Sequence, residues 1–309
     1  MNARRRMRPP QRERGLAFVL VLWVVAMLTI LLGSFSLIAR TENIQARHMF
    51  DTTQARYAAE AGLNLAAYEL RKSDPMLRWV GDGRPYTFGF GEAQVEVRIT
   101  DESGKIDLNG MAQGDPTTII NLFMAQGVPQ DKAESLAAAI KDWVDPDDET
   151  SLNGAEVSEY KGAGLSYGPA NAPFNTVSEL QQVLGMNYEL YTKVEPALTI
   201  YSGQQTPNAQ YAPLEALESM KDMTPECAQQ IIQQRQSMNA GDAPVSNEPI
   251  CGVSIGAVAG GGGVTYSVQS RAKMPNGAST TLDATIRMGG VNAAGRPFVI
   301  LRWRDGETS

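Results

Sequence analysis

The sequence predicts an α+β fold in which a long N-terminal helix packs on an antiparallel sheet, with a large all-α segment inserted within that sheet. Three observations predict this fold. An apolar run and a helical pattern together fill residues 16–72, and alternating segments typical of strands occur at 86–103 and again after residue 263. The residues between these segments follow helical patterns, and such an insertion is tolerated because loop-closure entropy grows slowly with length.

These segments divide the chain into five parts. We expect a basic leader at 1–15, a transmembrane helix at 16–39, a stalk helix with the first strands at 40–104, an inserted helical domain at 105–250 and the last strands at 251–309. Since 43% of the 309 residues are hydrophobic, the chain can bury at least one substantial core.

Charge is distributed unevenly along the chain, whose formal net charge is −7. Six arginines and one glutamate give the first fifteen residues a net charge of +5, so the remainder carries −12. A body this acidic repels phosphate backbones, which argues against nucleic acid as the main partner.

The predicted transmembrane segment contains no charged side chain between Leu16 and Ala39. At a rise of about 1.5 Å per residue, it would span a hydrocarbon core of roughly 30 Å. The preceding arginines are expected to hold the N-terminus in the cytoplasm. Arg40 follows the run directly, where a secretory signal would have a small-residue cleavage site. An ordinary single-pass membrane anchor is one interpretation of this segment.

The strand predictions rest on alternation and on turn residues. Residues 86–103 contain two short alternating runs, and residues 264–274 and 279–288 flank Pro275-Asn276-Gly277, which indicates a hairpin. Residues 297–306 supply a last strand. The long helix, with small side chains such as Ala58 and Ala61 at helical spacing, is expected to pack on this sheet.

The inserted segment contains three units in which two helical patterns flank a short apolar turn. The turns fall at Gly127-Val128-Pro129, at Leu184-Gly185-Met186 and at Met223-Thr224-Pro225. These units resemble helix-hairpin-helix or SAM-like units.

An acidic stretch between Asp142 and Glu156 places oxygen-bearing side chains close together in sequence. The candidate ligands are Asp145, Asp147, Asp148, Glu149, Asn153 and Glu156. Calcium takes six to eight oxygen ligands in flexible geometry. The spacing is not that of an EF-hand, so spacing alone leaves open both a calcium site and a solvated acidic turn.

The two cysteines, Cys227 and Cys251, form one possible disulfide. Beside a segment typical of export they indicate an oxidising compartment, and closing this loop would contribute roughly 3 kcal/mol to stability. Two buried free thiols are the alternative.

The sequence has little that indicates catalysis. The one histidine, His48, lies on the stalk helix without an accompanying nucleophile motif, and no phosphate-binding loop is found. One histidine and two distant cysteines also disfavour zinc. We therefore expect a protein that is not an enzyme, with a membrane-tethered hydrolase as a minor alternative.

The N-terminus resembles the type III signal of type IV pilins and pseudopilins, because Arg14-Gly15 stands immediately before the apolar helix. The resemblance implies that a prepilin peptidase cuts between Gly15 and Leu16 and methylates the new N-terminus. The mature chain departs from the pilin pattern in beginning with leucine and in having Leu20 where pilins have glutamate. Among pseudopilins, absence of this glutamate is characteristic of the K subunit.

Taken with the KIDLN stretch at 105–109 and the DWVDPDDE and NGAE stretches, nearly the whole chain resembles the minor pseudopilin K family of bacterial type II secretion systems. The resemblance implies a pilin-like fold with an inserted helical domain, calcium in that domain, and a position at the tip of the pseudopilus in the inner membrane. It also implies that minor pseudopilins I, J and H are partners, and that the filament supports export across the outer membrane.

Helix-hairpin-helix units also suggest a competing function, that of a membrane-tethered DNA-binding protein. Hairpins that hold DNA need turns flanked by lysine or arginine to contact phosphates. The three turns here have neutral or acidic neighbours, so we expect no nucleic acid partner.

Overall fold

The computed structural model describes residues 16–74, 77–112, 114–238, 249–253, 263–289 and 297–306. The chain divides into two units, Met1–Thr53 and Gln54–Ser309.

The first unit consists of the N-terminal part of helix α1, which runs from Leu16 to Glu69. The helix contains a window with a mean hydropathy of 2.6 and is long and apolar enough to cross a membrane. Its large apolar side chains, such as Phe18 and Trp23, are exposed. A helix suits a lipid environment because its backbone polar groups are satisfied within the segment.

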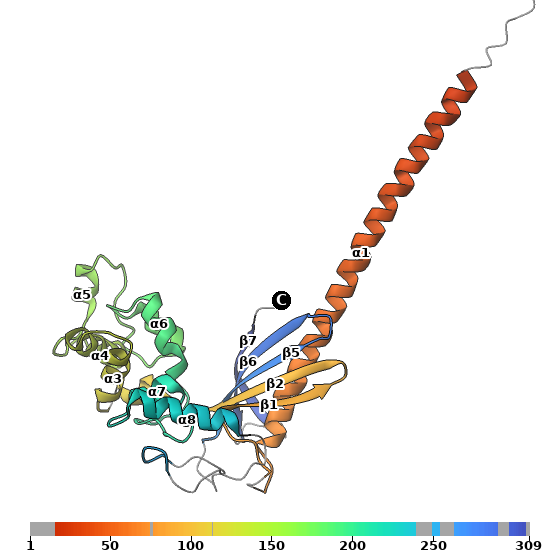
Figure 1. Ribbon diagram of the computed structural model, residues 1–309. Coiled ribbons are helices and arrows are strands. Elements are labelled where there is room, and N and C mark those ends of the chain that lie inside the picture. The colour runs from red at the N-terminus through yellow and green to blue at the C-terminus, as the bar shows by residue number, and fades with distance from the viewer. Residues whose placement is uncertain are drawn as a thin grey trace, which may run out of the picture. The chain divides into compact units, whose positions relative to one another are not determined.

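The second unit contains a five-stranded antiparallel sheet in the order β1-β2-β5-β6-β7 (Figure 1). Its strands are β1 (Asp82–Phe90), β2 (Ala93–Asp101), β5 (Thr265–Lys273), β6 (Ser279–Met288) and β7 (Phe298–Asp305). The turn before β6 contains Gly277 at φ +97°, a conformation that glycine adopts without steric cost. The strands predicted on both sides of the helical segment therefore form one sheet.

The C-terminal part of α1 packs on one face of this sheet (Figure 1). The helix contributes small buried side chains, and the strands contribute branched ones. The members of this core include Ala55, Ala58, Ala59, Leu63, Ala66, Ala67, Val95, Val97, Ile99, Val268, Leu282, Ala284 and Ile286. Gly62 allows the closest approach, since a Cβ there would collide with Ser270 Oγ and touch Val95 and Val97. The predicted α+β fold with its helix on an antiparallel sheet is confirmed.

The segment between β2 and β5 is mostly helical and has its own apolar core. Its helices are α2 (Leu108–Met111), α3 (Thr117–Ala125), α4 (Gln130–Val144), α5 (Val157–Gly162), α6 (Tyr188–Val194), α7 (Leu214–Glu218) and α8 (Pro225–Ser237). Short 3-10 helices occur at η1 (Glu102–Gly104), η2 (Val177–Gln182) and η3 (Glu195–Ala197). A parallel pair of two-residue strands, β3 (Ile106–Asp107) and β4 (Leu198–Thr199), is an addition to the all-α segment that the sequence predicts.

The turns predicted within the helical segment lie between helices in the structure. Gly127 separates α3 from α4 at φ +86°, and Gly185 separates η2 from α6 at φ +90°. Before α8, the Thr224 hydroxyl accepts a hydrogen bond from the Cys227 amide at 3.2 Å, and Pro225 occupies the first turn, where its missing N–H costs nothing.

Buried carboxylates hold the start of the helical segment against the sheet. Asp101 accepts hydrogen bonds from the amides of Ser103, at 2.9 Å, and Gly263, at 2.7 Å. Glu102 accepts one from Lys105 Nζ at 2.8 Å, one from Ser267 Oγ at 2.6 Å, and one from the Thr199 hydroxyl. Because the carboxylates are bonded on several sides, the chain enters and leaves the insertion at fixed positions.

Cys227 at the start of α8 forms a disulfide with Cys251, with a Cα–Cα distance of 6.1 Å. The bond connects α8 to the short segment that follows it in the described part of the chain. It closes a loop with a sequence separation of 24.

Candidate cation site

The acidic loop begins where α4 ends. One face of α4 is buried through Leu136, Ile140 and Trp143, which fixes the direction in which Asp142 points. The helix stops at Asp145, which has an extended backbone, because a residue that precedes proline is biased away from helical conformation. Asp142 and Asp145 therefore stand one helical turn apart at the entrance of the loop.

Asp142 is fully buried and organises the return of the loop. Its Oδ2 atom accepts hydrogen bonds from the amides of Ser151, at 3.1 Å, and Ala155, at 2.9 Å. Gly154 is required between them, since a Cβ at this position would collide with the Asp142 carboxylate. Asn153 provides the turn with a backbone φ of +64°.

Four side chains of this region have buried oxygen atoms without a hydrogen-bond partner among the described residues. These atoms are Asp142 Oδ1, Asp145 Oδ1, both carboxylate oxygens of Glu156, and Asn171 Oδ1. Burying a polar atom without a partner costs free energy, more so for a charged group. Several such oxygens in one region fit a site that binds a cation.

Asn171 reaches the loop from a distant part of the sequence. Its side-chain nitrogen donates to the backbone carbonyl of Asp147, at 3.1 Å, and to Asp148 Oδ1, at 2.9 Å. These two bonds fix the amide and leave its oxygen unpartnered. The loop and residue 171 therefore belong to one site.

The carboxylates of the loop repel one another. Burial raises the pKa of Glu156, and the negative charges of Asp142, Asp145, Asp148 and Asp147 raise it further. The pKa of Asp145 is raised by burial first, and then by Asp142 and Asp147. A bound cation would oppose both effects.

The sequence-predicted ligands take different positions in this arrangement. Asp145 and Glu156 carry unpartnered oxygens, and Asp147 and Asp148 lie close enough to affect the Glu156 pKa. Glu149 is exposed, and its amide donates to Asp147 Oδ1 at 2.9 Å. Asn153 is also exposed.

Two further candidate ligands were not among those predicted from the sequence, namely Asp142 and Asn171. Asp142 lies within the helical pattern of α4, and Asn171 is far from the acidic stretch. In the part of the chain that the structure describes, no group of three His, Cys, Asp or Glu side chains has the spacing of a preformed metal site. The six-residue ligand set therefore stays a prediction, and the donor chemistry, entirely oxygen, suits calcium.

The predicted processing site is only partly within the structure. Gly15 lies outside the described residues, and Leu16 is the first residue of α1. His48 is exposed on the same helix.

The part of the chain that contains this site matches a known family. Residues 104–203 match the family model of type II secretion system protein K. The matched range contains α4, the acidic loop and Asn171.

The resemblance to protein K is confirmed.

Relatives support the same conclusion. A type II secretion system protein K from Klebsiella pneumoniae is 30% identical over 203 residues, which cover 60% of this chain and 62% of that protein. Another protein K, from Pectobacterium carotovorum subsp. carotovorum, is 25% identical over 251 residues, covering 74% of this chain and 76% of the relative. The chain thus spans somewhat less than two thirds of the Klebsiella protein K.

The fold also resembles a solved structure, that of the GspK-GspI-GspJ complex from the type 2 secretion system of enterotoxigenic Escherichia coli. The TM-score is 0.58 at 21% sequence identity, and the match covers 85% of this chain and 99% of the solved chain. At 21% identity, this similarity shows that the two chains share a fold.

Proposed function

We propose that this chain is the minor pseudopilin K of a type II secretion system and that it stands at the tip of the pseudopilus. The observation that carries the proposal is the protein K domain at 104–203, inserted into a sheet that packs on the C-terminal part of a long apolar helix. The wide head that this insertion creates would cap or initiate the filament, which supports protein export across the outer membrane.

The proposed location is the bacterial inner membrane, with a short cytoplasmic N-terminus and a periplasmic head. The six N-terminal arginines favour this orientation. The disulfide between Cys227 and Cys251 suits an oxidising compartment. In this proposal a prepilin peptidase cuts between Gly15 and Leu16, and Leu16 is then methylated.

The proposed partners are minor pseudopilins I and J, with H beneath them. The solved complex contains GspK with GspI and GspJ, and the chain matches that fold over nearly the whole solved chain. In lipid, the helices of such subunits associate through close side-chain packing. The role is structural, so we propose no catalytic activity.

We further propose that the candidate cation site binds calcium. Asp142, Asp145, Glu156 and Asn171 would supply side-chain oxygens, with Asp147 and Asp148 beside them. Calcium would supply positive charge that offsets the repulsion between these carboxylates. The chain's own contribution is to hold the loop closed through Asp142 and Gly154.

Complementation of secretion tests the proposed function. In cells that lack their own K subunit, the chain co-expressed with its cognate I, J and H subunits and prepilin peptidase is expected to restore export and to co-purify with I and J. Mass spectrometry of the recovered chain is expected to show N-methyl-Leu16 as the first residue. Recovery of an uncut chain that does not bind I or J would contradict the proposal.

A further inference from the structure

The strand β7 forms an open edge of the sheet. It pairs with β6 on one side, and no described strand pairs with its other side. The opposite edge, β1, is protected in three ways: Pro85 lacks an amide hydrogen, the pairing with β2 is irregular between Asp82 and Pro85, and α8 packs beside the strand. The β1 edge is therefore protected against pairing with another strand, whereas the β7 edge is open to it.

Alternate residues of β7 direct their backbone N–H and C=O groups away from β6. The Gly306 amide donates to the Thr281 carbonyl at 2.8 Å, directly after the pairing of Asp305 with Leu282. In an antiparallel ladder, successive residues direct their N–H and C=O groups to opposite sides. Asp305 and Trp303 therefore present these groups to the open edge.

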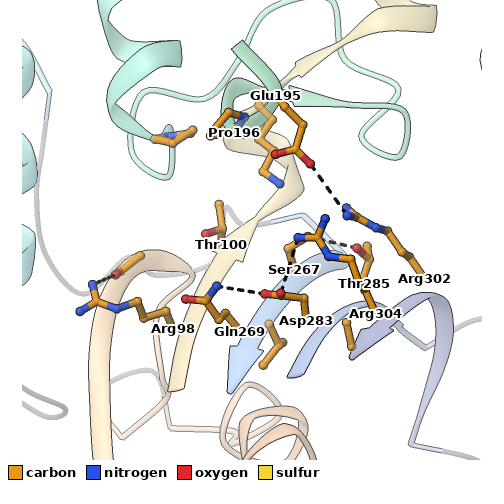
Figure 2. A pocket seen from close by; sticks show the side chains of 15 residues that line it. Arg98, Thr100, Glu195, Pro196, Ser267, Gln269, Asp283, Thr285, Arg302 and Arg304 are labelled. Atoms are coloured by element: carbon orange, nitrogen blue, oxygen red, sulfur yellow. Dashed lines mark hydrogen bonds and ion pairs between the residues drawn. The ribbon is translucent and has the colours of Figure 1, made fainter. Parts of the chain in front are cut away.

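One face of this edge carries two arginines that border a cavity of about 300 Å³. Figure 2 shows Arg302 and Arg304 beside Asp283 and Glu195. The nearest approach of Arg302 to Glu195 is 3.8 Å, and that of Arg304 to Asp283 is 3.6 Å. Both contacts are ion pairs that are longer than a hydrogen bond, so each guanidinium group keeps N–H donors for a further carboxylate beside its present partner.

Uncharged polar groups form the floor of the same cavity. Thr100, Ser267, Gln269 and Thr285 point from β2, β5 and β6 into the space below Pro196 (Figure 2). The cavity therefore has room and hydrogen-bonding groups for polar side chains of a ligand that lies along β7.

The other face of the edge carries apolar side chains that are incompletely covered, beside the ion pair between Asp305 and Arg56. Ile300 is 46% exposed and Trp303 is 39% exposed, although Ile300 pairs with the fully buried Ile286. At the start of β7 a recess of about 590 Å³ is lined on one side by Ala67, Tyr68 and Phe298. Its remaining lining is mostly polar: Asn64, Arg71, Lys72, Ser73 and Pro297. Apolar side chains of an added strand would complete this face of the sheet.

We propose that the β7 edge binds an extended segment of another polypeptide, which adds a strand to the sheet. The segment would place carboxylate side chains beside Arg302 and Arg304, and apolar side chains against Ile300 and Trp303. Main-chain hydrogen bonds to Trp303 and Asp305 would supply affinity, and the alternation of acidic and apolar side chains would supply specificity. This inference does not depend on the proposed function.

A second copy of the chain fits this edge poorly. An antiparallel copy that pairs Trp303 with Trp303 would place Arg302 opposite Arg304. Pairing Trp303 with Asp305 would place Arg304 opposite itself. Like charges directly opposite one another destabilise a strand pair. The arginines thus disfavour self-pairing in these two registers and favour an acidic segment.

A labelled peptide tests the proposal on the full-length chain in detergent. The probe is an eight-residue peptide that alternates glutamate with valine, with binding followed by fluorescence anisotropy. We expect saturable binding that weakens roughly tenfold or more in the double variant Arg302→Glu and Arg304→Glu. A peptide that alternates lysine with valine should show the reverse preference, binding the double variant more tightly than the wild-type chain.

Two controls separate strand addition from attraction of charge alone. The double variant Lys132→Glu and Lys161→Glu changes the net charge by the same amount, at two exposed residues that line neither cavity beside β7. It should bind the acidic peptide normally. An acidic peptide methylated at alternate backbone nitrogens cannot pair on that edge and should lose most of its affinity.

Undiminished binding of the methylated peptide, or no binding of the acidic peptide, would overturn the proposal. So would a concentration-dependent dimer, detected by sedimentation, that disappears in the Arg302→Glu and Arg304→Glu variant, because a second copy would then occupy the edge.

Discussion

Asp142 has two oxygens with different surroundings. Its Oδ2 atom accepts hydrogen bonds from the amides of Ser151 and Ala155, which close the loop. Its Oδ1 atom has no hydrogen-bond partner among the described residues. A residue of this kind couples the shape of the loop to the binding of a cation. Removing its charge should therefore affect cation binding more than it affects the loop.

The variant Asp142→Asn tests this coupling. The amide oxygen can still accept the two backbone bonds, but the negative charge is lost, so we expect calcium to stabilise the variant much less than the wild-type chain. At a calcium concentration 100-fold above Kd, ligand binding would contribute about 2.7 kcal/mol in the wild-type chain. Thermal unfolding with and without calcium measures the difference.

Glu149→Gln serves as the matched control, because Glu149 is an exposed carboxylate of the same loop. It should leave most of the calcium effect intact. An equal calcium effect in all three proteins would contradict the assigned site.

The raised pKa values of Asp145 and Glu156 predict how the calcium effect depends on pH. Without a cation, these two groups bind more protons in the folded chain than in the unfolded chain. Their contribution to the stability of the folded chain therefore decreases as the pH rises above their ordinary pKa values, 3.8 and 4.5. Bound calcium would offset this loss of stability, because its positive charge stabilises the ionised carboxylates. The calcium-dependent rise in Tm should therefore be larger at pH 7.5 than at pH 4.5, and a rise that is largest at the lower pH would contradict this reasoning.

How much of the site the sequence predicts depends on where each residue lies in the chain. Asp145 and Glu156 could be proposed because they lie in one acidic stretch, and Pro146 and Gly154 indicate a loop there. Asn171 could not, because only tertiary packing brings it to Asp147 and Asp148. A single sequence contains no signal for that contact.

At the scale of elements, the packing of α1 on the sheet depends on a row of small residues. Ala58, Gly62 and Ala66 are buried at intervals of four residues, so one face of the helix approaches β2 and β5 closely. The helical spacing predicts Ala58 on this face, whereas Ala61, which is also predicted there, is only half-buried. The strands are predicted from their alternation. Local patterns are sufficient here because each element buries only one face.

The variant Gly62→Val tests this close approach. Added methyl groups would collide with Ser270 and with the valines of β2, so we expect a loss of roughly 1–3 kcal/mol in the free energy of unfolding. Asn64→Val, on the exposed side of the same helix, should have a much smaller effect. Chemical denaturation followed by circular dichroism measures both, and equal stability of the two variants would show that the interface is looser than described.

Other elements could not be predicted from local patterns. The first strand begins at Asp82 rather than near Tyr86, because pairing with β2 extends past Pro85 through an irregularity. The pair β3 and β4 joins residues far apart in sequence and is too short to show alternation. In both cases long-range pairing, rather than the local sequence, determines the structure.

At the scale of the whole second unit, the helical segment enters and leaves the sheet at neighbouring points. Asp101 at the end of β2 pairs with Tyr266 near the start of β5. The two strands are therefore antiparallel neighbours that would form a hairpin if the intervening residues were short. Buried contacts at the junction, including the Gly263 amide on Asp101 and the Thr199 hydroxyl on Glu102, stabilise the longer connection.

Replacing residues 104–262 with a short glycine-containing turn should therefore leave the sheet and its packing on α1 intact. We expect the shortened chain to keep a cooperative unfolding transition and strand-type circular dichroism. Its stability should be reduced, because Lys105 and Thr199, two of the three partners of Glu102, are lost. It should show no calcium effect, since the whole candidate site is removed with the insertion. In the full chain, the same measurements should show both the transition and its dependence on calcium. If the shortened chain fails to fold, the helical segment is needed to form the sheet. The segment would then not be an insertion into a sheet that forms without it.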